Sequence, residues 1–212
     1  MRREVLGRAH GRRRDIDRVE LQPVHAGCGA AEMPTIFTHP AVAIAAAPWF
    51  RRLPRHAVVV AAVCASLPDI DVISFGLGIP YGATLGHRGF THSIVALGIA
   101  VLATVRLCRV ENSRASWRET LLFFSVVTLS HGLLDAATNG GRGVGFLIPF
   151  SSRRFFFPFR PIQVSPIGAG AFLERAGPVL VSELQWVWLP ALAIFFCGVI
   201  TGRFARSART TS

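Results

Sequence analysis

Five apolar stretches follow one another along this chain of 212 residues and constrain its fold more than any other feature. They cover residues 38–50, 57–68, 92–108, 119–137 and 178–200. A helix needs about 20 apolar residues to cross a bilayer, so the last stretch suffices alone, whereas the first two need tilting, a re-entrant path or shielding by neighbours. No stretch alternates as a half-buried strand does, and lipid does not tolerate an unpaired sheet edge. The sequence therefore predicts an all-α fold, an integral membrane bundle of four to five helices.

Composition supports a membrane protein and argues against most soluble classes. Hydrophobic residues make up 51% of the chain and charged residues 17%, whereas a soluble domain has about 25% charged residues. These values exclude a disordered chain, a coiled coil and most water-soluble enzymes. The 23 basic residues are all Arg and the net charge is +11, which in an apolar chain is more typical of cytoplasmic loops than of nucleic-acid binding. We therefore expect contact with membrane lipid and no nucleic-acid partner, and no feature specifies an oligomeric state.

The chain divides into a membrane-embedded domain at residues 33–203 and two basic ends. Residues 1–32 hold seven Arg and no long apolar run, so they do not form a secretory signal peptide. They are expected to be a disordered basic tail, or else to precede a true translation start at Met33. Residues 204–212 form a second, short basic tail. Residues 138–177 are rich in Gly, Pro, Phe and Arg and are predicted to form a long irregular loop with a function.

The few Asp and His side chains after Met33 lie mostly at the ends of the apolar stretches. That part of the chain contains three Asp and five His. If consecutive helices run antiparallel, the start of the first, the end of the second, the start of the third and the end of the fourth meet at one membrane face. Seven of the eight residues then converge there, while His56 falls on the opposite face. The seven are His39, Asp69, Asp71, His87, His92, His131 and Asp135.

Converging imidazoles and carboxylates indicate a divalent metal site, with zinc the expected ion. Ionisable residues at membrane depth are costly and therefore functional candidates, and His131 and Asp135 share one helix face because they are four residues apart. Each group also has an ordinary explanation. Asp69 and Asp71 could form a turn with a helix cap, Thr91 or His92 could cap an interfacial helix, and Asp135 could satisfy a buried His131. Their joint convergence favours the metal site over these separate explanations.

The same residues lie in segments that resemble a family of bacterial inner-membrane proteins, the YdjM type, regarded as metal-dependent hydrolases. The resemblance covers roughly residues 33–200 and is most specific between His87 and Ser93. It implies an inner-membrane location, metal-dependent hydrolysis and a His and Asp pattern similar to that of α-helical zinc phospholipase C-like enzymes, without a defined substrate. The matching segments are Met33-Pro-Thr with Thr38-His39, Pro68-Asp69-Ile-Asp71, His87-Arg-Gly-Phe-Thr-His92-Ser93, Ser130-His131-Gly-Leu-Leu-Asp135 with Thr138, Pro149-Phe150, Arg154-Phe155 and Val164-Ser165-Pro166.

The expected roles follow from side-chain chemistry. The four His are candidate ligands through neutral imidazole and the three Asp through their carboxylates. Because seven ligands exceed one tetrahedral zinc, either two metals bind or some of the seven orient the others. Asp69 or Asp71 could act as general base on an activated water. Arg88 is a candidate for binding a substrate phosphate or carboxylate, the alternative being an interfacial position with its charge in water.

Two functions remain open at this point. The first is a membrane-bound, metal-dependent hydrolase that acts on an amphiphilic, phosphate-containing or lipid-like substrate. The second is a non-enzymatic membrane protein, such as a transporter or a stress-linked partner protein, whose cluster binds metal or relays protons. Arg153, Arg154 and Arg160, beside the aromatic run at residues 155–157, could hold lipid head groups or could belong to a plain surface loop.

The distribution of Arg predicts the orientation of the bundle. Ten Arg lie in two short loops and the C-terminal end on the face opposite the site, and six lie in longer segments of the site face after Met33. The positive-inside rule weights short loops. We therefore expect a multi-pass inner (plasma) membrane protein with a cytoplasmic C-terminus and an extracytoplasmic site. Counting residues 1–32 would add seven Arg to the site face and reverse this expectation.

Overall fold

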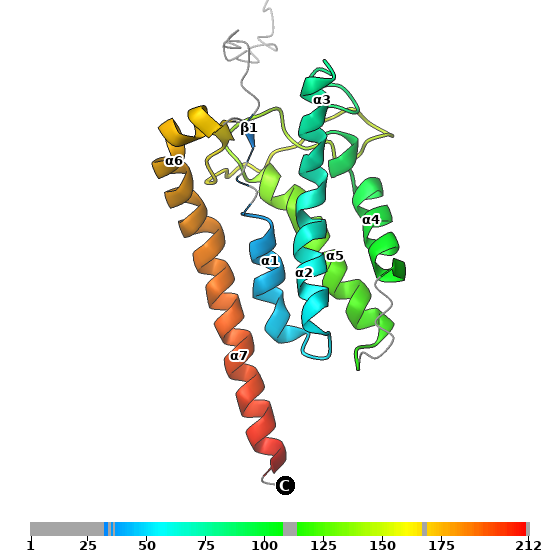
Figure 1. The fold of residues 1–212 in the computed structure, drawn as a ribbon, viewed down its shortest axis with the longest axis vertical. Helices are drawn as coiled ribbons and strands as arrows, with labels where there is room; N and C mark the ends of the chain where they lie inside the picture. Colours follow the sequence, from blue (N-terminus) through cyan, green and yellow to red (C-terminus); the bar gives the residue numbers. More distant parts are fainter. Residues whose placement is uncertain (1–31, 34, 36, 108–113, 167–168, 211–212) are drawn as a thin grey trace, which may run out of the picture.

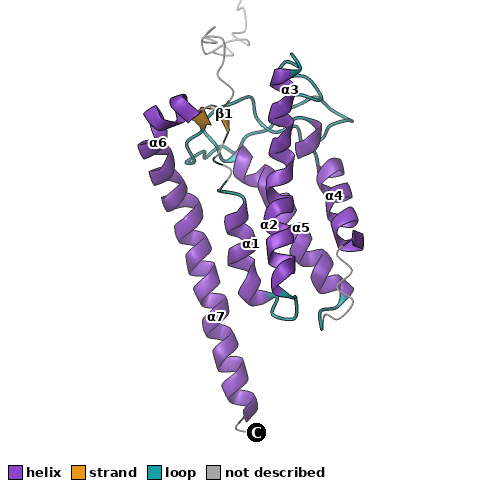
Figure 2. Ribbon diagram, in the orientation of Figure 1, coloured by secondary structure: helices purple, strands orange, loops and turns teal. Residues whose placement is uncertain are grey.

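The described part of the chain is a bundle of helices that lie side by side and alternate in direction (Figures 1 and 2). The computed structural model describes residues 32–33, 35, 37–107, 114–166 and 169–210, so the expectation for the N-terminal tail concerns residues outside the described ones. Within those ranges, the only β-ladder longer than a single bridge joins two strands of two residues each. The prediction of an all-α fold is confirmed.

Five helical segments correspond to the five apolar stretches. Several of their ends coincide with local sequence signals: Pro40 stands in the first turn of the first helix, where a missing N–H costs nothing. At Ser116 a capping box begins the fourth segment, because the Ser116 side chain accepts from the Glu119 N–H while the Glu119 carboxylate accepts from the Ser116 N–H. The elements are β1 Glu32–Met33, α1 Pro40–Ala46, the 3₁₀ turn η1 Ala47–Trp49, α2 Arg55–Ser66, the 3₁₀ segment η2 Leu67–Val72, α3 Ile73–Gly76, the 3₁₀ turn η3 Phe90–His92, α4 Ile94–Leu107, α5 Trp117–Ala136, β2 Ser165–Pro166, α6 Ala169–Glu183, the π-turn η4 Leu184–Trp188 and α7 Leu189–Thr210.

The second and last segments are longer than the apolar stretches suggest. Pro68 lies in the first turn of η2, where its missing N–H is tolerated, so the helical path continues from α2 through α3. Likewise α6 begins at Ala169 and contains Pro178. The irregular loop predicted for residues 138–177 is therefore shorter than expected, because its last residues are helical. Among the described residues, the helices Arg55–Gly76 and Phe172–Phe204 are therefore long and apolar enough to cross a membrane.

The core is built from small residues on α1 and α2 that pack against larger ones on α5. Ala43, Ala57 and Ala61 are fully buried beside Phe123 and Phe124. Small side chains allow helix backbones to approach closely, as is common between membrane helices. This close packing brings the first residue of α1, the last turns of α2 and α5, and η3 to the same end of the bundle.

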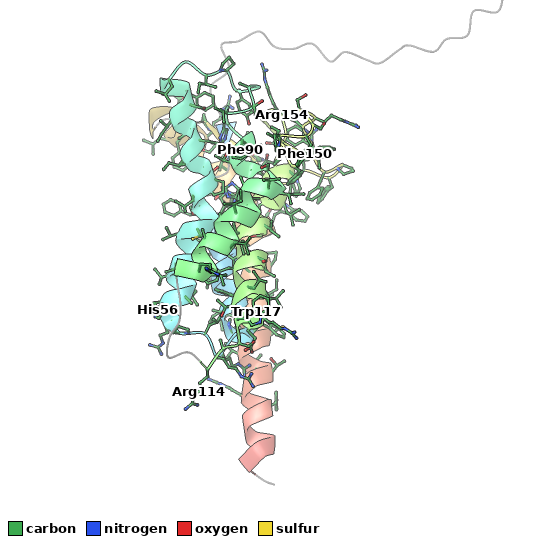
Figure 3. The ribbon with its side chains drawn as sticks, turned by 90° about the vertical axis from the view of Figure 1, so that its right-hand side faces the viewer. His56, Phe90, Arg114, Trp117, Phe150 and Arg154 are labelled. Atoms are coloured by element: carbon green, nitrogen blue, oxygen red, sulfur yellow. The ribbon has the colours of Figure 1, made fainter. Side chains whose placement is uncertain are left out.

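The two ends of the bundle differ in what they carry. His56, Arg114 and Trp117 lie at one end, and Phe90 and Arg154 lie at the other (Figure 3). The predicted site residues belong to the second end, which the long connection between α5 and α6 covers (Figure 1). The antiparallel arrangement inferred from the sequence therefore brings the predicted site residues to one end.

Candidate metal centre

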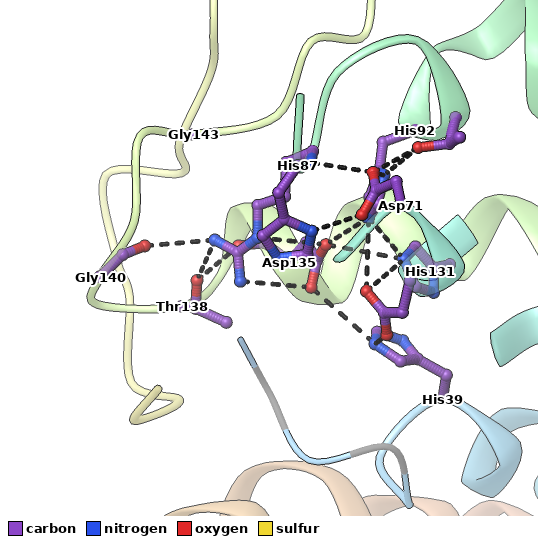
Figure 4. A network of polar contacts seen from close by, with 12 residues as sticks. His39, Asp71, His87, His92, His131, Asp135, Thr138, Gly140 and Gly143 are labelled. Atoms are coloured by element: carbon purple, nitrogen blue, oxygen red, sulfur yellow. Dashed lines mark hydrogen bonds and ion pairs between the residues drawn. The ribbon is translucent and has the colours of Figure 1, made fainter. Parts of the chain in front are cut away.

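Four buried side chains from three separate segments offer ligand atoms to one point. Asp69 comes from η2, His92 from η3, and His131 and Asp135 from the last turns of α5, and one ligand atom of each lies within 4.8 Å of the others. The Nε2 atoms of His92 and His131 are 2.8 Å apart, and Nε2 of His92 is 3.0 Å from Oδ2 of Asp135. Figure 4 shows the two rings and Asp135 directed toward one another. Two imidazoles and two carboxylates match the ligand types of zinc.

The partners of the two rings show which nitrogen atoms carry protons. Nδ1 of His131 lies 2.7 Å from the carbonyl oxygen of Ala65, which can only accept, so this nitrogen donates. Nδ1 of His92 lies 3.1 Å from Oδ2 of Asp71, and an ionised carboxylate also only accepts. In neutral rings both Nε2 atoms then present lone pairs to each other at 2.8 Å, so either a proton on Nε2 of His92, which is also 3.0 Å from Oδ2 of Asp135, or a bound cation must lie between them. This arrangement suits two imidazoles bound to one cation, with each Nδ1–H held by an acceptor.

The carboxylate of Asp69 has no hydrogen-bond donor among the described residues, whereas that of Asp135 lies beside the Arg88 guanidinium. Among the described residues, no hydrogen bond reaches either oxygen of Asp69 or Oδ2 of Asp135. Oδ1 of Asp69 lies 3.6 Å from Nε2 of His92 and 3.5 Å from Nε2 of His131. Buried carboxylate oxygens without donors are costly, and a bound cation would offset that cost.

His39 lies against the other side of the two carboxylates. Its ring stacks on His131 with centroids 3.8 Å apart, and its Nε2 is 3.4 Å from Oδ2 of Asp69 and 3.8 Å from Oδ1 of Asp135. Both ring nitrogens of His39 lack hydrogen-bond partners among the described residues. His39 is thus close enough to add a ligand to the same centre.

Asp71 and His87 form a pair beside these five residues. Nδ1 of His87 lies 2.5 Å from Oδ1 of Asp71, and Oδ2 of Asp71 accepts from the Thr91 hydroxyl and from the Arg88 backbone N–H. Both Asp71 oxygens therefore already have protein donors, while Nε2 of His87 has no hydrogen-bond partner among the described residues. The structure brings all seven predicted residues together, but Asp71 is arranged to orient the rings rather than to bind an ion.

Arg88 is fully buried and directed at protein groups. Its Nε lies 3.3 Å from Oδ2 of Asp135, and its Nη1 donates to Oγ1 of Thr138 at 3.0 Å and to the Gly140 carbonyl at 3.2 Å. The backbone φ of 57° at Arg88 is in the left-handed region, which is uncommon for a residue other than glycine. This geometry indicates that Arg88 holds Asp135 in place. It does not favour the contact with substrate that the sequence analysis expected.

Comparison with known proteins shows the family of this chain. The model of the family described as YdjM inner membrane protein matches residues 33–208. The chain belongs to the YdjM family. It is 42% identical over 165 residues to the inner membrane protein YbcI of Escherichia coli (strain K12), over 76% of this chain and 95% of that protein. No solved structure matches the chain. The resemblance inferred from the sequence is confirmed, and an inner-membrane location is supported by the family and by the apolar helices.

Arg154 stabilises the loops around the centre of this YdjM-family protein. Its guanidinium donates to the carbonyls of His87, Arg88 and Gly143, and also to those of Tyr81 and Ala83. The sequence analysis considered Arg154 for binding lipid head groups, but in the structure its guanidinium donates to these carbonyls.

Burial raises the pKa of Tyr81, so its hydroxyl next to the centre stays protonated at neutral pH.

Glu183 is a site-supporting residue that the sequence analysis missed. Its side chain on α6 is 1% exposed, and its oxygens accept from the backbone N–H of Thr35 at 2.7 Å and from the Thr35 hydroxyl at 2.6 Å. Thr35 precedes His39 by four residues, so this contact ties the end of α6 to the segment that carries a candidate ligand. The sequence did contain a signal for it, because Glu183 is the only acidic residue in the apolar stretch 178–200 and a buried carboxylate there needs a partner.

Proposed function

We propose that this YdjM-family protein is a metal-dependent hydrolase of the inner membrane. The carrying observation is the pair of Nε2 atoms 2.8 Å apart, next to the buried Asp69 carboxylate, whose oxygens have no hydrogen-bond donor among the described residues. Asp69, His92, His131 and Asp135 would hold the divalent ion, with zinc the expected species because it takes nitrogen and oxygen ligands and can expand from four to five ligands to admit a water. The substrate is an amphiphilic, phosphate-containing ester.

Asp69, Asp71 and Arg88 have different proposed roles in hydrolysis. When bound, a divalent ion supplies Lewis-acid activation of water and of the scissile group. Asp71 keeps the rings of His87 and His92 oriented, and Arg88 holds Asp135. Asp69 would bind the ion through one oxygen and accept a proton from the attacking water through the other, because neither oxygen has a hydrogen-bond donor to displace. The water oxygen bonds to phosphorus, the ester P–O bond breaks, and the proton passes to the leaving oxygen.

We further propose that the bundle crosses the membrane several times, with its C-terminus in the cytoplasm. The segments Arg55–Gly76 and Phe172–Phe204 have the length for it, and the shorter helices Pro40–Trp49 and Ile94–Arg106 lie alongside them. Five alternating segments put the candidate centre on the side away from the C-terminus.

Metal content tests the proposed centre directly. We expect detergent-solubilised wild-type protein to carry about one zinc per chain and the His92→Ala variant to lose at least roughly tenfold of it, since a ligand and its lone pair are removed. His56→Ala is the matched control, because His56 lies at the opposite end of the bundle. Equal zinc in both variants, measured by inductively coupled plasma mass spectrometry, contradicts the metal centre.

A phosphoester assay and a growth assay of the His92→Ala variant together separate the hydrolase from the non-enzymatic alternative. If His92→Ala loses zinc and also the release of product from a phosphoester, the hydrolase is supported. Loss of zinc with an unchanged growth phenotype would instead favour a membrane protein whose cluster binds metal or relays protons without catalysis.

A further inference from the structure

An apolar groove of about 1080 Å³ runs between α1 and α2 and reaches the candidate metal centre. Ile44 of α1 and Val59, Ala62 and Val63 of α2 line its length, and Asp69 is among the residues of its wall, with its carboxylate buried behind the surface. Asp69 is the ligand candidate whose two oxygens lack donors. The groove therefore joins an apolar surface to a residue of the candidate centre.

The groove opens toward the bilayer. Ile44, Val59 and Val63 are 43%, 64% and 57% exposed, and α2 belongs to a segment long enough to cross a membrane. Apolar side chains exposed on such a segment contact lipid tails, not water. A hydrocarbon chain in the bilayer can thus move into the groove sideways without crossing an aqueous phase.

The length of the groove matches a lipid tail. Val58 and Asp69 both line it, and a helical rise of about 1.5 Å per residue places them roughly 16 Å apart. Half of the hydrocarbon core of a bilayer is about 15 Å. A chain from one leaflet, entering between α1 and α2, would therefore place its head group beside Asp69.

We propose that the substrate is a membrane lipid that binds sideways, with one hydrocarbon chain in the groove between α1 and α2 and its phosphate-bearing head at Asp69. The reaction and the binding of the head group rest on the proposed metal-dependent function, whereas the binding of the hydrocarbon chain does not. An anionic head group would complement the divalent cation proposed for the centre, and the apolar walls complement the tail.

Photo-crosslinking tests the binding of the chain without relying on activity. The probe is hexadecyl phosphate with a diazirine near the end of its chain, added to the full-length, zinc-loaded protein in phosphatidylcholine nanodiscs. We expect label in peptides from α1 and α2, and a roughly tenfold loss of that label in Ala62→Phe, because the larger side chain displaces methylene groups of the probe. Ala103→Phe, on the exposed face of α4 and outside the groove, is the matched control and keeps the label.

Hydrolysis of two esters separates the groove from the hydrolase. The pair is p-nitrophenyl hexadecyl phosphate and p-nitrophenyl methyl phosphate, and the preference for the long chain should fall roughly tenfold in Ala62→Phe. Zinc content of that variant shows whether it has folded. Label in the groove without hydrolysis of either ester supports the lipid site and overturns the hydrolase. Label spread evenly over α4 and α7, equal label in the two variants, or equal hydrolysis of both esters overturns the lipid site.

Discussion

Asp71 controls the protonation of the two rings beside it. Its Oδ1 accepts from Nδ1 of His87 and its Oδ2 faces Nδ1 of His92, so the Nε2 atoms of both rings keep their lone pairs. The Thr91 hydroxyl donates to the same carboxylate and holds it in place. Of the two residues that the sequence offers as general base, Asp69 is therefore the better proposal, since its oxygens have no donors among the described residues.

Arg88 is the residue for which the geometry most changes the expected role. Because its guanidinium lies 3.3 Å from Asp135 and donates to Thr138, Arg88→Lys should lower zinc affinity about 10-fold to 100-fold, as is typical when the residue that orients a ligand is changed. A lysine ammonium cannot reproduce the planar fork. Zinc titration of the detergent-solubilised protein measures this effect, with the exposed Arg153→Lys as control.

A substrate-binding role for Arg88 makes a different prediction. If the guanidinium held the phosphate, Arg88→Lys would leave zinc affinity unchanged and raise the KM for a phosphoester. That outcome would restore the role expected from the sequence and exclude the positioning of Asp135.

At the scale of elements, the contact between α6 and the segment before α1 is expected to stabilise the centre. Glu183→Gln replaces one accepting oxygen by a donating amide opposite the Thr35 donors, so we expect the free energy of unfolding to fall by about 2 kcal/mol. Unfolding of the protein in detergent micelles measures it. Glu174→Gln changes an exposed carboxyl on the same helix and should leave stability unchanged. Equal stability of the two variants would mean that the Thr35 contact contributes nothing.

Local signals explain which elements could be predicted. Pro40 and the capping pair Ser116 and Glu119 are local signals at the starts of helices in the structure, although the apolar stretches alone predicted the segments. The continuation past Pro68 and the start of α6 before Pro178 were missed, because a proline shows where an N–H is absent but not whether the helix continues.

The same distinction applies to the candidate site. Alternating helix direction was enough to bring His39, Asp69, His92 and His131 to one end of the bundle, since it depends only on the order of the segments. The contact of Thr35 with Glu183 joins residues 148 positions apart, and no local pattern contains such a partner. The contacts of Arg154 with five carbonyls depend on loop geometry that the sequence pattern likewise does not specify.

At the scale of the whole molecule, packing and chemistry occupy different parts of the bundle. Buried alanines and phenylalanines fill its middle, the candidate centre lies at one end, and the groove joins that end to the lipid-facing side. Because the ligands come from three separate segments, the centre exists only when those segments are packed. Metal binding should therefore be linked to the folding of the bundle as a whole.

The orientation of the bundle decides which compartment the candidate centre faces. The end opposite the centre carries ten Arg in its two short loops and the C-terminal end, and short basic loops stay in the cytoplasm. A green fluorescent protein fused to the C-terminus should therefore fluoresce, and alkaline phosphatase fused there should be inactive. Fusion after Phe150, at the end that carries the centre, should give the reverse pair of results and serves as control. Phosphatase activity without fluorescence at the C-terminus would show an inverted bundle, and an N-terminal peptide that includes the seven Arg of residues 1–32 would then identify the charge that inverts it.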